Sequence, residues 1–179
     1  MQTLREKNIH LQTLPLKYAL DIARGLQHLH AQSPPIVHRD IKPGNILVDA
    51  KDVAKISDLG ESRAVDTDVT MTLVGTALYC APEVLMNQDR YDESADIYSF
   101  GITLNQMDTL EQPYTHTHFN IVKVVQNGMR PIRVQERPDH LRWLDDLIIA
   151  CFRPHGPMRP KAVDVCGVLI SNMNAVMNA

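Results

Sequence analysis

The chain has 179 residues, a length that fits one domain or part of a larger one. Its 18 basic and 21 acidic side chains leave a formal net charge of −3, which is too small to argue for nucleic acid or an anionic membrane as a partner. The three cysteines, Cys80, Cys151 and Cys166, lack the spacing of a metal site, so we expect reduced thiols in the core.

The ends of the chain and its apolar runs bear on location. The first ten residues are polar and include Arg5, Glu6 and Lys7, unlike a signal peptide. The longest strongly apolar run, residues 147–152, is far too short to span a bilayer. We therefore expect an intracellular protein, cytoplasmic or nuclear, with no membrane segment in this chain.

Most of the expected elements are helices. After a frayed entry over residues 1–14, apolar residues recur at helical spacing over 15–31, and Ser33-Pro34-Pro35 ends that helix. Similar patterns predict a short helical piece beginning at Pro82 and longer helices over residues 94–110, 118–127, 139–152 and 161–177.

Strands are expected only near the middle of the chain. Ile36-Val37 reads as a short strand, and two β-branched-rich runs, 45–48 and 53–57, are separated by four residues that suit a turn. The sequence therefore predicts a mainly α fold with a small β hairpin.

Four histidines raise the question of a metal site. They form two close pairs, His28 with His30 and His116 with His118. No cysteine or carboxylate near either pair completes a set of ligands, so we expect surface histidines rather than a metal site.

Residues suited to phosphate chemistry are concentrated in residues 38–45. Asp40 is an acid able to accept a proton from a hydroxyl nucleophile, and Lys42 can neutralise charge on a transferring phosphoryl group. Arg39 can bind a phosphate with two parallel hydrogen bonds.

The expected hairpin adds a second feature, because it brings Asn45 and Asp58 together. Amide and carboxylate oxygens are ligands that Mg²⁺ accepts beside substrate phosphates. Taken alone, Asp58 is equally consistent with a solvated loop carboxylate. Its framing by Asn45 and Asp40 favours the catalytic interpretation.

Five motifs together resemble one family. Residues 38–45 resemble the catalytic loop of protein kinases, and Asp58-Leu59-Gly60 resembles their metal-binding tripeptide with Leu in place of Phe. The others follow in the family's order: Gly75-Thr76 with Ala81-Pro82-Glu83, residues 96–101, and Cys151 to Arg159-Pro160. A lone His-Arg-Asp is weak evidence, but this ordered set is specific.

The resemblance implies an active site that uses ATP and Mg²⁺. Asp40 would position the substrate hydroxyl and Lys42 would stabilise the γ-phosphate, while Asn45 and Asp58 would hold the metal. Leu47 corresponds to the family's apolar floor for adenine, although ordinary core packing explains this residue equally well.

The resemblance also implies a regulatory loop, the activation segment over residues 58–83. Arg39 and Arg63 match the positions that grip a phosphorylated loop in the family, and Thr72 is the candidate phosphosite. An unmodified Thr72 is the alternative. Thr76 would bond the catalytic acid and the lysine.

Four further residues have structural roles in the family. His38 would pack beneath the catalytic loop and is not assigned as a base. Glu83 would pair with Arg159, and Asp96 would accept hydrogen bonds from backbone amides of the catalytic loop. A simple acid at a helix N-terminus is the alternative for Asp96.

Two dipeptides refine the resemblance. Lys42-Pro43 follows the serine/threonine form of the catalytic loop, and Arg130-Pro131 is typical of the tyrosine-kinase-like group of these enzymes. We therefore expect a serine/threonine protein kinase that acts on protein substrates. The alternative is a catalytically silent interaction module that docks partners through residues 118–131.

The family's small lobe has no counterpart in the sequence. No glycine-rich loop precedes residue 38, so we expect residues 1–179 to be a partial kinase domain containing the C-lobe without the N-lobe. Such a chain would expose apolar surface around Leu47 and Leu59. Its ATP site would have a floor but no roof.

Overall fold

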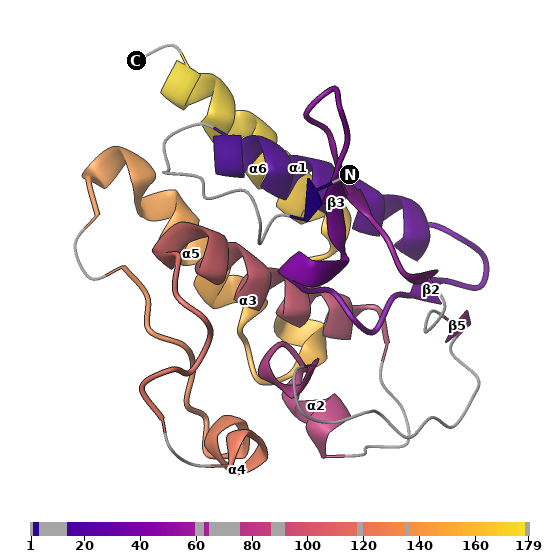
Figure 1. Cartoon of the computed structure of the whole chain (residues 1–179), viewed down its shortest axis with the longest axis vertical. Coiled ribbons are helices and arrows are strands. Elements are labelled where there is room, and N and C mark those ends of the chain that lie inside the picture. Colours follow the sequence, from indigo (N-terminus) through magenta and orange to yellow (C-terminus); the bar gives the residue numbers. More distant parts are fainter. Residues whose placement is uncertain are drawn as a thin grey trace.

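The computed structural model describes residues 2–3, 14–59, 63–64, 76–86, 92–117, 120–134 and 137–177. Its helices, drawn in Figure 1, are α1 (Leu14–His30), α2 (Pro82–Leu85), α3 (Ser94–Thr109), α4 (Ile121–Gln126), α5 (Arg142–Cys151) and α6 (Ala162–Met177). The strands are β1 (Gln2–Thr3), β2 (Ile36–Val37), β3 (Ile46–Val48), β4 (Ala54–Ile56) and β5 (Arg63–Ala64). Short 3₁₀ turns occupy Pro43–Asn45, Thr76–Leu78, Asp139–Leu141 and Gly156–Met158.

The predicted mainly α fold with a small hairpin is confirmed. Strands β3 and β4 pair antiparallel, with Ile46 opposite Ile56 and Val48 opposite Ala54. The predicted frayed entry is wrong at Gln2–Thr3, which pairs with β3, while residues 4–13 lie outside the described part of the chain.

The predicted helix over 118–127 is shorter than expected. Helix α4 begins at Ile121 because the Asn120 side chain caps it, accepting a hydrogen bond of 2.9 Å from the Val122 amide. Residues 118–119 lie outside the described part of the chain.

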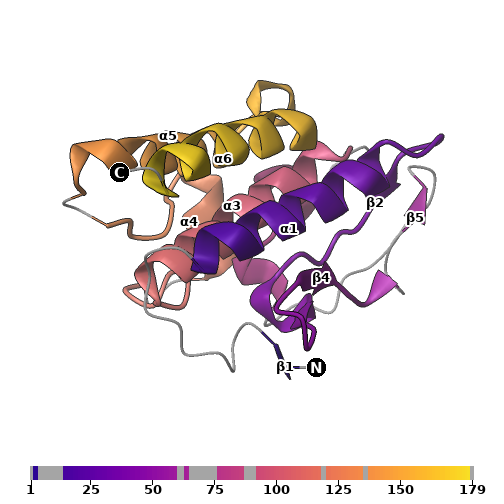
Figure 2. The same ribbon diagram turned by 90° about the horizontal axis from the view of Figure 1, so that it is seen from above.

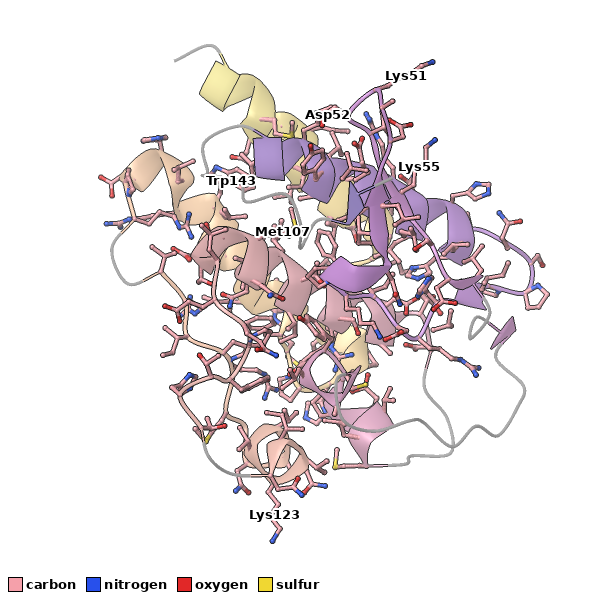
Figure 3. The ribbon with its side chains drawn as sticks, viewed as in Figure 1. Lys51, Asp52, Lys55, Met107, Lys123 and Trp143 are labelled. Atoms are coloured by element: carbon pink, nitrogen blue, oxygen red, sulfur yellow. The ribbon has the colours of Figure 1, made fainter. Side chains whose placement is uncertain are left out.

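Helix α3 forms the centre of the core. Every residue from Ala95 to Asn105 is buried, and in Figure 2 this helix lies between α1 and α5. Gly101 lets α3 approach α5 closely, since a Cβ atom there would lie 2.5 Å from the Cβ of Cys151. Met107 on α3 and Trp143 on α5, labelled in Figure 3, are partly buried and pack against this core.

Helix α1 joins the helical core to the hairpin. It packs against α6 on one side and β4 on the other, with Tyr18, Ile22 and Leu26 fully buried. Because β4 leads directly to Asp58, the packing of α1 against β4 supports the end of the hairpin that carries this candidate metal ligand.

The cysteine prediction is confirmed, because all three cysteines are buried thiols outside any disulfide. Burial raises the pKa of Cys80 and of Cys151 to about 12, which keeps both thiols protonated at neutral pH. Within the described ranges, no helix combines the length and hydropathy that a bilayer crossing requires.

Candidate active site

The loop after β2 is anchored from below by a buried carboxylate. Asp96, fully buried near the start of α3, accepts hydrogen bonds of 2.8 Å from the backbone amides of His38 and Arg39. This is the contact that the resemblance implied. Arg39 has a φ angle of 73°, a backbone conformation that costs a non-glycine residue about 1–3 kcal/mol. The hydrogen bonds to Asp96 hold the loop in that conformation.

A third group reaches the same carboxylate, and it corrects one prediction. His30 was expected at the surface, but its Nε2 atom lies 2.9 Å from Oδ2 of Asp96 and its side chain is only 8% exposed. The partner lies 66 residues further along the chain, so the neighbouring sequence gives no sign of it. His28 and His116 are exposed as expected, and His118 is outside the described residues.

His38 connects the loop to the end of β4. Its Nδ1 atom accepts a hydrogen bond of 3.3 Å from the Asp40 amide, so its Nε2 atom carries the proton and donates to the Ser57 carbonyl at 2.9 Å. Both ring nitrogens are engaged and the residue is fully buried. This geometry agrees with a supporting role rather than that of a base.

Asp40 lies at the centre of a polar cluster. Its Oδ2 atom accepts hydrogen bonds from Lys42 Nζ at 2.6 Å and from Asn45 Nδ2 at 2.7 Å. Its Oδ1 atom is buried and has no hydrogen-bond partner among the described residues. A buried carboxylate oxygen without a donor is costly, so this atom is suited to accept a hydrogen bond from an incoming hydroxyl.

The hairpin brings Asp58 to this cluster. The Ser57 amide and hydroxyl both donate to the Asn45 carbonyl, at 2.8 and 2.9 Å, extending the β3–β4 ladder to its open end. Asp58 follows directly, exposed and with a φ angle of 62°. The structure therefore gathers Asp40, Asn45 and Asp58 at one end of the hairpin. The positive φ angle of Asp58 is a backbone conformation that is typical of functional sites.

The donor set fits a hard divalent cation. Both hydrogen bonds from Asn45 Nδ2 go to Asp40, one to its carbonyl at 2.8 Å, which leaves the amide oxygen available to a cation. Asp58 directly follows Ser57, is exposed, and supplies a carboxylate at the same end of the hairpin. Two such ligands suit Mg²⁺, which takes its remaining ligands from water and phosphate. Among the described residues there is no group of three His, Cys, Asp or Glu that could hold a metal by itself.

The apolar residues beside the cluster differ in exposure. Leu59 is 52% exposed, as expected for apolar surface at this edge. Leu47 is half-buried in the middle of β3, a position that fits both an adenine floor and ordinary core packing.

The predicted regulatory residues are only partly described. Arg63 lies in β5, opposite Val37 in β2, and Thr76 begins a 3₁₀ turn, but the structure does not describe either side chain. Thr72 lies outside the described residues. Phosphorylation of Thr72 and phosphate binding by Arg39 and Arg63 therefore stay predictions.

The expected ion pair between Glu83 and Arg159 is present. The two side chains form a bidentate contact with distances of 2.6 and 2.8 Å, and the Arg159 side chain is fully buried. Arg159 also donates to the carbonyls of Ser94, Arg153 and Pro154. These contacts tie α2 to the start of α3 and to the loop before α6.

The sequence is similar to known proteins over most of its length. The model of the protein kinase domain matches residues 1–168. A serine/threonine-protein kinase/receptor of Acanthamoeba polyphaga mimivirus is 37% identical over 155 residues, which cover 86% of this chain and 9% of that protein. A serine/threonine-protein kinase of Dictyostelium discoideum is 45% identical over 153 residues, which cover 82% of this chain and 20% of that protein. A serine/threonine-protein kinase of Arabidopsis thaliana is 36% identical, covering 86% of this chain and 15% of that protein.

Proposed function

This chain belongs to the protein kinase family, and from that premise we propose that it carries the catalytic machinery of a serine/threonine kinase. The reaction would transfer the γ-phosphoryl group of ATP to a Ser or Thr hydroxyl of a protein. The observation that carries the proposal is the arrangement of the Asp40 carboxylate. Its Oδ2 atom accepts a hydrogen bond from Lys42, whereas its Oδ1 atom has no hydrogen-bond partner among the described residues.

The proposed mechanism depends mainly on position. The Oδ1 atom of Asp40 accepts a hydrogen bond from the substrate hydroxyl and so aims its oxygen at the phosphorus. Because the transition state is loose, the hydroxyl proton leaves late and orientation matters more than basicity. Lys42, whose side chain is 26% exposed, holds Oδ2 and presents positive charge to the transferring group.

Asn45 and Asp58 are the residues that would hold Mg²⁺. When bound with ATP, the metal would supply positive charge that stabilises the negative charge developing on the transferring phosphoryl group. The chain's own contribution is to keep one amide oxygen and one carboxylate side by side, through the hydrogen bonds from Ser57 to the Asn45 carbonyl.

The proposal also covers the kinase group to which the chain belongs and its location in the cell. Lys42-Pro43 supports serine/threonine specificity, which is also the specificity named for the relatives. Arg130-Pro131 supports membership in the tyrosine-kinase-like group, and we propose an intracellular location. The chain spans 9% to 20% of the length of the three relatives above, so the activity, substrates and regulation of a longer protein belong to the proposal as well.

A silent interaction module is the second candidate. The described part of residues 118–131 includes α4, from which Lys123 points outward in Figure 3. Met129 and Ile132, just after this helix, are 43% and 45% exposed. Exposed apolar side chains near a charged one suit the binding of a protein partner, a function that requires no catalytic activity.

Thermal unfolding with increasing Mg-ATP distinguishes the two candidates. At 100 times the Kd, a ligand stabilises the folded state by ~2.7 kcal/mol, which corresponds to a rise of roughly 5–10 °C in Tm for a chain of this size. Asp58→Asn should reduce the rise by about half or more, whereas Asp146→Asn, which alters an exposed carboxylate on α5, should keep it. No rise at millimolar Mg-ATP in the unaltered chain would favour the silent module.

A further inference from the structure

We propose that one face of α1 positions the metal-binding end of the hairpin, with Asp21 as its central positioning residue. The face consists of Tyr18, Asp21 and Gly25, and we call it the α1 clamp. Its role rests on the proposed function, because the residue that it positions is the candidate metal ligand Asp58. None of the clamp residues touches the proposed substrate or metal.

The clamp follows the hairpin arm over residues 52–56, which includes β4. Residues 18, 21 and 25 lie on one face of a helix, and they contact alternate residues of the hairpin arm. The Tyr18 hydroxyl donates to Oδ1 of Asp52 at 2.5 Å, and Figure 3 shows Asp52 beside α1. At the other end, a Cβ atom on Gly25 would lie 2.8 Å from Cδ1 of Ile56, so helix and strand approach closely.

Asp21 makes the central contact of the clamp. Its Oδ2 atom accepts a hydrogen bond of 3.1 Å from the Ala54 backbone amide. Lys17 donates to the same carboxylate oxygen at 3.3 Å and also to the carbonyl of Asp52, which links both hairpin contacts through one cation.

The hydrogen-bond pattern of the hairpin explains why Ala54 needs this partner. The cross-strand bonds run from Asp49 to Val53 and from Ser57 to Asn45, so the Ala54 amide alternates outward, away from β3. Ala54 is only 4% exposed, and a buried amide without an acceptor is destabilising. The Asp21 carboxylate supplies the acceptor that a third strand would otherwise provide.

The consequence is a fixed register at the site. A slip of one residue would turn every side chain of β4 to the other face. Asp58 follows Ala54 by four residues in the sequence, and Ser57 between them bonds the Asn45 carbonyl. Holding Ala54 against α1 therefore holds Asp58 beside Asn45.

Amide hydrogen exchange measured by NMR on the 179-residue chain tests the clamp without any ligand. In Asp21→Ala, the Ala54 amide should exchange about tenfold faster or more, as expected when a hydrogen bond to a charged acceptor is lost. The Ser57 amide should accelerate as well, because it depends on the register. Asp21→Asn keeps an acceptor and should restore most of the protection, and Asp146→Ala should leave both rates unchanged.

Two outcomes of this experiment in Asp21→Ala decide the proposal. Faster exchange at both amides in Asp21→Ala supports it. Faster exchange at Ala54 with an unchanged rate at Ser57 would overturn it, since the contact would then be only local. Tyr18→Phe, which keeps the buried ring and removes the bond to Asp52, should accelerate exchange at the Ser57 amide severalfold. This variant keeps the proposal testable if Asp21→Ala does not fold.

A second measurement connects the clamp to the metal site. Mn²⁺ alone, added to the unaltered chain, should broaden the NMR signals of Asn45 and Asp58, and Asp21→Ala should need about five times more Mn²⁺ for the same effect. Equal broadening in both would overturn the positioning role. No broadening in the unaltered chain would overturn the metal site itself, and with it the role assigned to the clamp, whatever the exchange rates show.

Discussion

Replacing Arg159 by methionine tests the energetic weight of the Glu83–Arg159 ion pair. The Arg159 side chain is fully buried and the Glu83 side chain is 14% exposed, so solvent cannot compensate for a missing partner. The substitution leaves one carboxylate without its counter-charge and three backbone carbonyls without their donor. Removing one partner of a buried pair costs about 3–5 kcal/mol, which corresponds to a fall of roughly 6–20 °C in Tm for a chain of this size.

Urea unfolding provides the assay, and an exposed ion pair provides the matched control. Arg142 and Asp139 lie 2.8 Å apart with side chains 72% and 87% exposed, so Arg142→Met should change the free energy of unfolding by less than about 1 kcal/mol. If Arg159→Met costs no more than this control, the reasoning is refuted. The double variant Glu83→Met with Arg159→Met should cost less than the sum of the two single variants.

Three further predictions concern other parts of the chain. Because burial raises the pKa of Cys80 and Cys151 to about 12, a thiol reagent at pH 8 should modify them only after unfolding; labelling in the folded state, read by mass spectrometry, would contradict this. His30→Ala should lower the free energy of unfolding by about 1–3 kcal/mol, because the fully buried Asp96 loses one donor; an unchanged urea midpoint would refute the contact. Hydrogen bonds lower the pKa of Asp49 from 3.8 to about 2, so its stabilising effect should be present above pH 4 and lost as the pH falls through 2; carboxyl NMR signals that titrate near pH 4 would contradict this.

Local patterns were sufficient to predict most elements. Apolar residues at helical spacing located α1, α3, α5 and α6 to within a few residues, because each of these helices buries one face or more in a common core. Asn120 before α4 is a typical N-cap residue, so the sequence did indicate where that helix begins, and this signal was overlooked.

Contacts between distant segments were not legible in the sequence. The contact of His30 with Asp96 and the pairing of Gln2–Thr3 with β3 join residues far apart in the chain, and nothing in the neighbouring residues indicates either partner. The contacts of Asp96 with the loop amides and of Glu83 with Arg159 were expected only from the resemblance. The functional roles of these residues stay predictions.

The site residues likewise include some that local sequence patterns predicted and one that they did not. The hairpin spacing alone predicted that Asn45 and Asp58 would meet, and the register of β3 and β4 brings them to one end. The contribution of Ser57, which joins them through the Asn45 carbonyl, was missed because a serine at the end of a strand carries no distinctive signal.

Isothermal titration of Mg-ATP into the unaltered chain and into Asp58→Asn tests the central claim most directly, that Asp40, Asn45 and Asp58 form one nucleotide–metal site. We predict saturable binding to the unaltered chain and an affinity at least about tenfold weaker for Asp58→Asn. This is the change expected if the lost metal ligand contributes about 1.4 kcal/mol or more to the binding free energy. Equal affinity in the two chains, or no binding to the unaltered chain, would contradict the claim.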